Sequence, residues 1–398
     1  MNRRIAPYAL ALMLTAAVAS SLDETGHSSR STERLSSSVE QRLVRTLLDV
    51  QAGRLDDAMK HLDRLIEAQP DFELAQLVRG DVLSALAAPL DDFGARRAAE
   101  ERLQGLRAEA KARWVHFQEA PPSLSVPADL VKIADSASHA ILVDTSRYRL
   151  YVFATDGNET RRLLDFYVSI GKAGDEKWYE GDLKTPIGLY RVASYLPGEG
   201  LPDMYGRGAF PIDYPNAWDR LQGRTGSGIW IHGTESERYS RPPRSSRGCV
   251  TLSNEDFLRL KEAVEVGKTP VVLSRDVRWV SSESVEATRR SVSHAIETWR
   301  LDWESRNSDR YLSNYSESFR TAEMNRPAFA DHKRRVNGSK SFIEIEVSDL
   351  GIYGYPGEPS MVIVEFMQGY RSNSFSGARR KRQHWRLEEG VWRIVFES

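Results

Sequence analysis

The sequence contains a single cysteine, Cys249, within the stretch SSRGCVTLSN. A free thiol is mostly protonated at neutral pH, with a pKa of about 8.5, and needs a base to become a nucleophile. The stretch GIWIHGT offers such a base. Alternate side chains of a strand share a face, so Ile229 and Ile231 are expected to face the core, with His232 on the opposite side. The polar, Pro-rich loop between the two stretches allows the chain to return, which predicts a Cys-His nucleophilic pair.

The residues around Cys249 suit that chemistry. Gly248 gives the backbone freedom to turn, so that its N–H and that of Cys249 could converge as an oxyanion hole. Ser253, followed by an acidic residue at Asp256, is typical of a helix N-cap, and an apolar stripe follows. The helix start and the neighbouring Arg247 would both favour the thiolate.

The N-terminus predicts the compartment in which this thiol works. Residues 1–19 begin with Arg3 and Arg4, continue as a short apolar run, and end in small residues, as in a secretory signal peptide. A short membrane anchor is the alternative. No later segment is apolar enough to cross a membrane, and residues 20–38 have the composition of a flexible leader. We therefore expect a periplasmic protein. Its lone cysteine would be a buried thiol, a bond to another chain or a nucleophile.

Length and charge predict an ordinary soluble protein of several domains. The chain has 398 residues, with 55 basic and 56 acidic side chains, so its overall charge gives no indication of nucleic-acid binding. Residues 39–120 show helical periodicity, with offsets that resemble one tetratricopeptide unit. Such a unit cannot bury its own apolar face, so this region is either a helical spacer or a module that docks a protein partner or a second copy.

The periodicity changes to that of strands in the next region. Residues 138–275 contain short, glycine-punctuated strands that predict a β-rich, mostly antiparallel domain, beginning with a hairpin in ILVDTSRYRLYVF. From about residue 284, an aromatic amphipathic helix reaching into NYSESF is followed by three strand-like runs. This order predicts an α+β cone over 284–398, which resembles the SnoaL and nuclear-transport-factor-like fold.

Four ordered motifs resemble the YkuD-type L,D-transpeptidase family. They are the hairpin, the segment SIGKAGDEKWYEGDLKTPIGLYRV, the His-Gly-Thr stretch and the cysteine stretch. The resemblance implies Cys249 as nucleophile, His232 as general base, Gly233 as the carbonyl that orients the imidazole, and Gly248 as an oxyanion donor. Ser246 and Asn254 match the motif serine and its closing asparagine, and we place both among the substrate-binding residues.

Two positions depart from the family pattern. The usual histidine before Gly-Cys is Arg247 here, and the usual arginine after the cysteine is Thr251. Arg247 either binds the substrate carboxylate in place of that arginine or is a solvated loop residue. The aromatic, Gly-rich loop LPDMYGRGAFPIDYPNAW suits a lid or a substrate wall. Its candidates for substrate contact are Tyr205, Arg207, Phe210 and Tyr214.

The resemblance implies acyl transfer on peptidoglycan stem peptides, without metal or cofactor. Cys249 would attack the bond between the L-centre of meso-diaminopimelate and D-alanine, forming a thioester that an amine then accepts. An L,D-carboxypeptidase with a role in cell shape, a hydrolase of a peptidoglycan–lipoprotein link and a non-catalytic wall-binding scaffold are the alternatives. The basic run Arg379–Arg382 is expected to be a solvated hairpin or a contact to an anionic surface.

Overall fold

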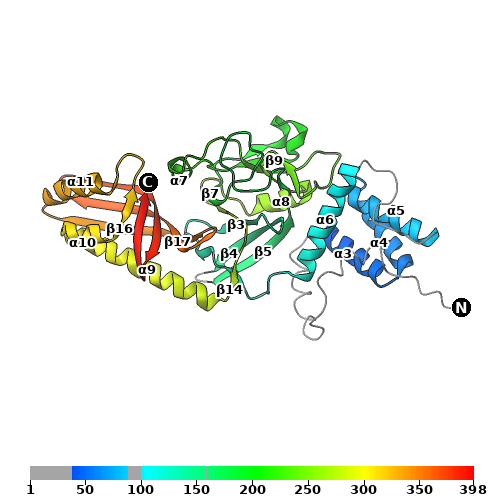
Figure 1. Cartoon of the computed structure of the whole chain (residues 1–398), viewed down its shortest axis with the longest axis horizontal. Coiled ribbons are helices and arrows are strands. Elements are labelled where there is room, and N and C mark those ends of the chain that lie inside the picture. Colours follow the sequence, from blue (N-terminus) through cyan, green and yellow to red (C-terminus); the bar gives the residue numbers. More distant parts are fainter. Residues whose placement is uncertain (1–37, 88–99, 157–158) are drawn as a thin grey trace.

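The computed structural model describes residues 38–87, 100–156 and 159–398 (Figure 1). A helical part lies at one end, a β-rich part in the middle and an α+β part at the other end. The predicted signal peptide (1–19) lies outside the described residues, as does the predicted leader (20–38) except for Ser38. Within the described ranges, none of the helices is long and apolar enough to cross a membrane.

The N-terminal part is helical, as its apolar spacing predicts. Its core contains Leu43, Leu62, Val78 and Trp114, all at most 5% exposed. Gly53, with φ of +73°, lies between the first two helices, where a left-handed residue allows a tight turn. Its tetratricopeptide-like character stays a prediction. The helices are α3 (Ser38–Gln51), α4 (Leu55–Ala68), α5 (Glu73–Ala87) and α6 (Glu100–Gln118).

Two main sheets form the β-rich middle. One is five-stranded, in the order β5-β4-β3-β13-β7, and the other is four-stranded, in the order β12-β10-β9-β8. Most pairs are antiparallel, as predicted, but β3 with β13, β10 with β12 and β6 with β11 are parallel. The strands are β3 (His139–Asp144), β4 (Arg149–Asp156), β5 (Glu159–Tyr167), β6 (Ile170–Gly171), β7 (Gly188–Arg191), β8 (Leu196–Pro197), β9 (Gly208–Pro211), β10 (Trp230–His232), β11 (Arg244–Ser246), β12 (Val250–Thr251) and β13 (Pro270–Ser274). Short helices are η2 (Gly198–Gly200), η3 (Asp203–Tyr205), α7 (Ala217–Leu221) and α8 (Asn254–Glu262).

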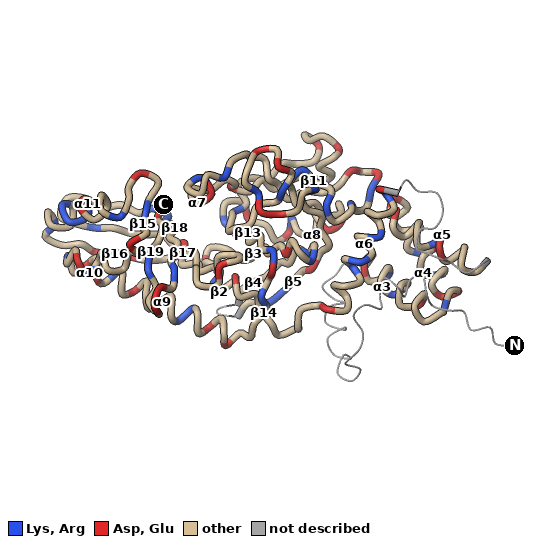
Figure 2. Tube along the Cα trace, viewed as in Figure 1, with Lys and Arg blue, Asp and Glu red and all other residues tan. Residues whose placement is uncertain are grey.

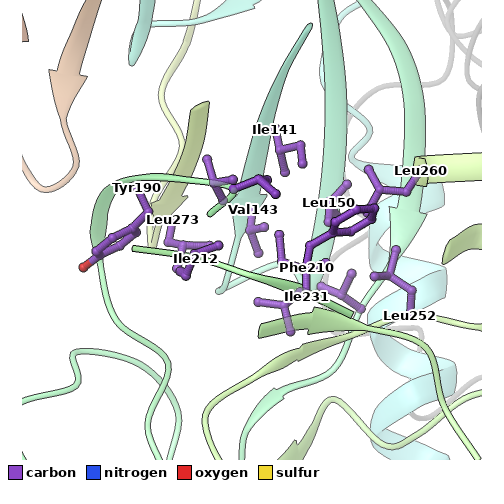
Figure 3. Close-up of a cluster of buried hydrophobic side chains, with 14 of the residues drawn as sticks. Ile141, Val143, Leu150, Tyr190, Phe210, Ile212, Ile231, Leu252, Leu260 and Leu273 are labelled. Atoms are coloured by element: carbon purple, nitrogen blue, oxygen red, sulfur yellow. The ribbon is translucent and has the colours of Figure 1, made fainter. Parts of the chain in front are cut away.

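The core of the middle part lies between these two sheets (Figure 3). Ile141 and Val143 of β3 contribute from the five-stranded sheet, and Phe210 of β9 and Ile231 of β10 from the four-stranded one. Leu260 of α8 belongs to the same cluster. The alternation of buried side chains along β10 therefore fixes which of its residues face away from the core.

The C-terminal part is built on a six-stranded sheet in the order β15-β19-β18-β17-β16-β2. Its edge strand β2 precedes the middle part in the sequence, so the sheet is completed from outside the C-terminal region. Its elements are β2 (Leu130–Lys132), α9 (Ser282–Glu304), α10 (Ser308–Ser313), β15 (Tyr315–Arg320), α11 (Arg326–Gly338), β16 (Ile343–Tyr355), β17 (Glu358–Ser372), β18 (Ser376–Glu388) and β19 (Val391–Glu397). A small antiparallel pair joins β1 (Val126–Pro127), which precedes the middle part in the sequence, to β14 (Trp279–Val280), which follows it.

Two sequence expectations for this part are wrong. The predicted long helix breaks after Glu304, because Arg306 has φ of +62° and the Asn307 side chain caps a new helix by accepting from Asp309 N and Arg310 N. The segment that follows α10 is strand β15. The last of the three predicted strand runs is in fact two strands, separated by a turn in which Gly390 has φ of +80°.

The basic run Arg379–Arg382 lies in the β17–β18 hairpin and is solvated only in part, since Arg379 and Arg380 are exposed but Lys381 and Arg382 are not. It lies within β18, where Lys381 is buried and paired with Glu397 at 2.5 Å. Arg380 pairs with Asp349 at 2.7 Å, and Arg382 pairs with Glu365 at 2.5 Å. Figure 2 shows basic and acidic residues interspersed over all three parts of the chain.

Candidate active site

The pairing of β10 with β12 places Cys249 and His232 on the same side of a sheet. The two strands are parallel, with Ile231 opposite Val250 and His232 opposite Thr251. Ile231 and Val250 are each 1% exposed and belong to the core. Side chains alternate along strands, so His232 and Thr251 face away from that core. Cys249, one residue before Val250, faces the same way as His232.

The imidazole of His232 is held as one tautomer. Its Nδ1 lies 2.5 Å from the carbonyl oxygen of Gly233, the contact that the resemblance leads us to expect. A carbonyl only accepts, so Nδ1 carries the proton and Nε2 keeps a free lone pair. In this state Nε2 accepts from the Thr251 hydroxyl at 3.4 Å. The ring of Tyr205 lies edge-on at 5.0 Å from the imidazole. His232 is thus oriented as a base.

The thiol of Cys249 is partly exposed, and its sulfur donates to the carbonyl of Gly228 at 3.5 Å. The backbone N–H of Trp230, on the neighbouring strand, also faces the sulfur. The thiol and Nε2 therefore have separate partners at rest, Gly228 and Thr251. Both contacts are long for hydrogen bonds, at 3.5 and 3.4 Å, and therefore weak.

Burial keeps both members of the pair neutral. It lowers the pKa of His232 to about 4, and the positive charge of Arg241 acts in the same direction. Burial also raises the pKa of the Cys249 thiol, against the opposing effects of the Trp230 N–H, Arg241 and Lys177. This effect of burial acts against the thiolate that the helix start and Arg247 are expected to favour.

The loop that carries Cys249 is fixed by two hydroxyl groups. Ser246 Oγ donates to Cys249 O at 2.6 Å and accepts from Gly248 N at 3.1 Å. Thr185 Oγ1 donates to Gly248 O at 3.0 Å. Gly248 has φ of +123°, and a Cβ there would lie 2.7 Å from the carbonyl oxygen of Lys184, so only glycine fits. Because Ser246 accepts from the Gly248 N–H, an oxyanion would have to share or take over that donor.

Asn254 links the segments on either side of the catalytic histidine. Its Oδ1 accepts from Arg207 N at 2.9 Å, and its Nδ2 donates to Thr234 O at 2.8 Å. A Cβ on Gly233 would lie 2.3 Å from that Oδ1. Both Asn254 and Ser246 thus bind the backbone of the site, which makes them positioning residues for the loops as well as candidates for substrate contact.

The remaining predicted contact residues fall into two groups. Arg207 and Arg247 are exposed, and neither guanidinium has a hydrogen bond or ion pair among the described residues. They are available to a substrate carboxylate, together with the ring of Tyr205. Phe210 and Tyr214 are core residues, 2% and 5% exposed, and the expectation that they contact substrate is wrong. Strand β9 carries Phe210 into the space between the sheets, against Phe257 at 5.2 Å.

Sequence reasoning missed Arg241 and gave no role to Thr185. Arg241 is 7% exposed and donates to the side chains of Thr234 and Glu235 and to the carbonyl oxygen of Met204. An arginine before two prolines in a polar loop gave no signal of burial. Over the described residues, no cluster of His, Cys, Asp and Glu side chains could hold a metal ion.

Comparisons with known proteins identify the families of the middle and C-terminal parts. Residues 138–273 match the L,D-transpeptidase catalytic domain family YkuD. The middle part of the chain is a YkuD-type L,D-transpeptidase catalytic domain. Residues 291–398 match the Cds6 C-terminal NTF2-like domain, which confirms the predicted nuclear-transport-factor-like fold.

Relatives of known sequence include the probable L,D-transpeptidases ErfK/SrfK of Salmonella typhimurium and Escherichia coli. The first is 28% identical over 48% of this chain and 61% of its own length. The second is 27% identical over 42% of this chain and 54% of its own length. The match thus covers less than two thirds of either relative.

Solved structures match over more of the chain. Bd1075 of Bdellovibrio bacteriovorus is 28% identical, with a TM-score of 0.60, over 69% of this chain and 97% of that protein. Pgp2 of Campylobacter jejuni, described as a helical cell shape determining protein, is 26% identical, with a TM-score of 0.58, over 69% of this chain and 94% of Pgp2. Both likenesses extend well beyond the catalytic domain.

Proposed function

We propose that this protein is an exported enzyme that cleaves peptidoglycan stem peptides through a Cys249 thioester. The observation that carries the proposal is the shared face of β10 and β12, which holds His232, oriented by the Gly233 carbonyl, and Cys249, the only thiol of the chain. The predicted signal peptide and the wall-directed family support a periplasmic location. Finding the mature protein in the cytoplasm with residues 1–19 intact would contradict that location.

The reaction divides into two steps. Nε2 of His232 takes the proton of Cys249 Sγ as the sulfur attacks the carbonyl carbon between the L-centre of meso-diaminopimelate and D-alanine. The amide N–H groups of Gly248 and Cys249 are the proposed oxyanion donors. The C–N bond breaks, the imidazolium returns its proton to the amine of D-alanine, and a thioester remains. An acceptor amine or water then releases the acyl group.

Two acceptors remain as candidates for the second step. The first is an amine, which makes the protein an L,D-transpeptidase, as the family and the ErfK/SrfK relatives support. The second is water, which makes it an L,D-carboxypeptidase that trims tetrapeptides. The likeness to nearly the whole of the cell-shape protein Pgp2, NTF2-like part included, favours this second candidate. Hydrolysis of a peptidoglycan–lipoprotein link would use the same thioester.

The test uses a disaccharide tetrapeptide with and without an added amine. Cys249→Ala and His232→Ala should each abolish D-alanine release, and the double variant should be scarcely worse than either, because the two residues act as a unit. General-base assistance alone is typically worth about 10²–10⁴-fold. Cross-linked product would indicate the transpeptidase, and tripeptide alone the carboxypeptidase. Full activity of Cys249→Ala would overturn the proposal.

We propose that Arg247, the exposed cation that stands where the family usually has histidine, binds a carboxylate of the substrate. Arg247→Gln should raise KM about tenfold or more while changing kcat little, because the guanidinium is exposed and bears on ground-state binding of a carboxylate. Arg290→Gln, on the solvent side of α9, is the matched control. An unchanged KM would identify Arg247 as a solvated residue.

A further inference from the structure

The loop between the catalytic strands is anchored in the helical part of the chain. Residues 233–243 connect β10 to β11, and Tyr239 within them belongs to the helical core, 5% exposed. The ring of Tyr239 lies 4.7 Å from that of Phe72. The neighbouring Ser240 donates from Oγ to Glu109 Oε1 on α6 at 2.7 Å. The loop therefore contributes one side chain to the helical core and one hydrogen bond to α6.

Helix α6 is seated directly on this loop. A Cβ on Gly105 would lie 2.8 Å from Cγ of Pro242, so a larger residue would push the two apart. Glu109, which receives the Ser240 hydroxyl, is itself bound to Arg113 at 2.9 Å, and both side chains are at most 3% exposed. The helical part thus holds the segment 239–242 with buried contacts.

Arg241 lies between these anchors and reaches toward the active site. Its Nε donates to Thr234 Oγ1 at 3.2 Å and to Glu235 Oε2 at 3.0 Å, just after His232 in the chain. Its Nη2 donates to the carbonyl oxygen of Met204 at 2.8 Å. The next residue, Tyr205, packs its ring against the imidazole. The guanidinium of Arg241 therefore links the two segments that flank the His232 ring, 204–205 and 234–235.

We propose that Arg241 is a positioning residue for the Cys249–His232 pair, and that the helical part of the chain holds it in place. The helices would then be a working part of the active site, whatever else they bind. The rate measurements below rest on the proposed function, whereas the labelling measurements do not. Bidentate and backbone contacts of a planar guanidinium explain why an arginine stands here, since lysine cannot make them together.

The charge of Arg241 gives the proposal a second readout. The charged groups near His232 are Arg241 and Glu235, and those near Cys249 are Arg241 and Lys177. Arg241 opposes protonation of the imidazole and favours the thiolate. Removing its charge should therefore raise the pKa of both groups.

The experiment compares full-length Arg241→Met, Arg241→Lys, Ser240→Ala and Asp63→Asn. Iodoacetamide labelling of Cys249 is followed from about pH 5 to pH 10, alongside kcat and KM for D-alanine release. Arg241→Met should move the labelling midpoint to higher pH and lower kcat about 10–100-fold, with little change in KM. Arg241→Lys should restore the midpoint but not kcat. Asp63→Asn, which breaks a surface pair with Arg79 inside the helical part, should change neither.

Ser240→Ala tests whether the helical part fixes the position of Arg241, because it removes the hydrogen bond to Glu109. It should lower kcat a few-fold in the wild-type background and have no further effect on Arg241→Met, because Ser240 acts through Arg241. Independent, multiplying effects would overturn the link to the helices, and an unchanged labelling profile in Arg241→Met would overturn the role of Arg241. If Arg241→Met does not fold, Arg241→Lys and Ser240→Ala decide. If the wild type releases no D-alanine while labelling responds as expected, the proposed function fails and this inference stands.

Discussion

At the residue scale, the catalytic pair is neutral before it reacts. Burial lowers the pKa of His232 to about 4 and raises that of Cys249 above its usual value. A neutral imidazole accepts a proton without first having to lose one, and a neutral thiol resists oxidation until substrate arrives. As a neutral thiol, however, the sulfur is a poor nucleophile. It becomes a good one only when Nε2 of His232 gives up its contact with the Thr251 hydroxyl and accepts the thiol proton.

This neutrality predicts an unusual pH dependence. As pH rises, kcat/KM should increase with a midpoint of about 4, where His232 loses its proton, and then stay level through neutrality. Iodoacetamide labelling of the free enzyme should become fast only at alkaline pH, because the thiol pKa is raised. Stopped-time assays over the pH range measure both. A labelling midpoint near pH 6 would instead indicate a resting thiolate–imidazolium pair.

Thr185 provides a second prediction at this scale. Its hydroxyl accepts from Gly171 N at 2.9 Å and donates to Gly248 O at 3.0 Å, so Thr185→Val leaves two backbone groups without their partner. We expect a loss of about 1–3 kcal/mol in the free energy of unfolding for each stranded group, and a fall in kcat as the cysteine loop loosens. Thermal melting and D-alanine release measure these.

Two other variants serve as controls for Thr185. Thr185→Ser should restore both quantities, since it keeps the hydroxyl. Thr298→Val, which removes an exposed hydroxyl bonded within α9, should change neither. An active and stable Thr185→Val would show that the cysteine loop is held by Ser246 alone.

At the element scale, local patterns predicted much of the site but not its topology. The hairpin β3–β4, the cap of α8 by Ser253 and the orientation of His232 follow from residues close in sequence. The parallel pairing of β10 with β12 and the entry of β2 into the C-terminal sheet depend on contacts between distant segments. Sequence periodicity carries no record of such contacts. Arg241 was missed for the same reason, because its partners are set by tertiary packing.

The helical part and the catalytic sheet are joined by a buried ion network. Arg149 of β4, fully buried, pairs with Glu40 of α3 at 2.7 Å and with Asp165 of β5 at 2.5 Å. His116 of α6 also reaches Asp165, at 2.8 Å. Burial by itself would raise the pKa of Glu40 and of Asp165, but Arg149 together with the neighbouring cations outweighs it, so that the pKa of each carboxyl lies below its usual range.

Removing Arg149 should therefore uncouple the two elements. Arg149→Met removes the cation shared by two buried carboxylates, leaving Glu40 with Arg113 and Asp165 with His116, and should cost about 3–5 kcal/mol at neutral pH. A carboxyl whose pKa is lower in the folded than in the unfolded chain stabilises the fold at pH values above its unfolded pKa of about 4. This stabilisation is lost as the pH falls through the folded pKa. Arg149→Met lacks this stabilisation, so the difference in free energy of unfolding between the wild type and the variant should shrink below about pH 4. Hydrogen exchange of the α3 amides measures the loss of stability, and Arg79→Met is the surface control. A loss that stays constant with pH would contradict the role of this ion network.

At the scale of the whole molecule, the C-terminal part cannot be treated as a detachable module. Leu130 of β2, Leu142 of β3 and Tyr353 of β16 belong to one buried cluster that continues across both sheets. Trp218 of α7 stacks on His384 of β18 at 4.5 Å and donates to the hydroxyl of Tyr355. Deleting residues from about 284 onward would expose this cluster and leave β2 unpaired, so point variants are the sharper test of what the C-terminal part binds.

The NTF2-like part contains a cavity of about 440 Å³ suited to such a test. Trp303, Tyr370 and Phe375 line it, together with Lys333, whose Nζ lies 4.5 Å from the centre of the Trp303 ring. Asn337 Nδ2 and Gln368 Oε1 are buried at its wall without a hydrogen-bond partner. An aromatic cavity with basic side chains (Lys333, Lys340 and Arg379) and unused polar atoms at its wall is fit to bind a ligand that has both polar and apolar groups.

Lys333→Met in this cavity separates wall binding from chemistry. It keeps the length of the side chain and removes the charge, and burial already lowers the pKa of Lys333 to about 8, so the fold should tolerate the change. If the cavity binds a glycan or peptide of the wall, the variant should release D-alanine from a soluble tetrapeptide at the normal rate but act several-fold more slowly on whole sacculi. Lys340→Met, at the same cavity but hydrogen-bonded outward to Ser374, should have a smaller effect. Equal loss on both substrates would mean that the C-terminal part supports the catalytic domain and does not present it to the wall.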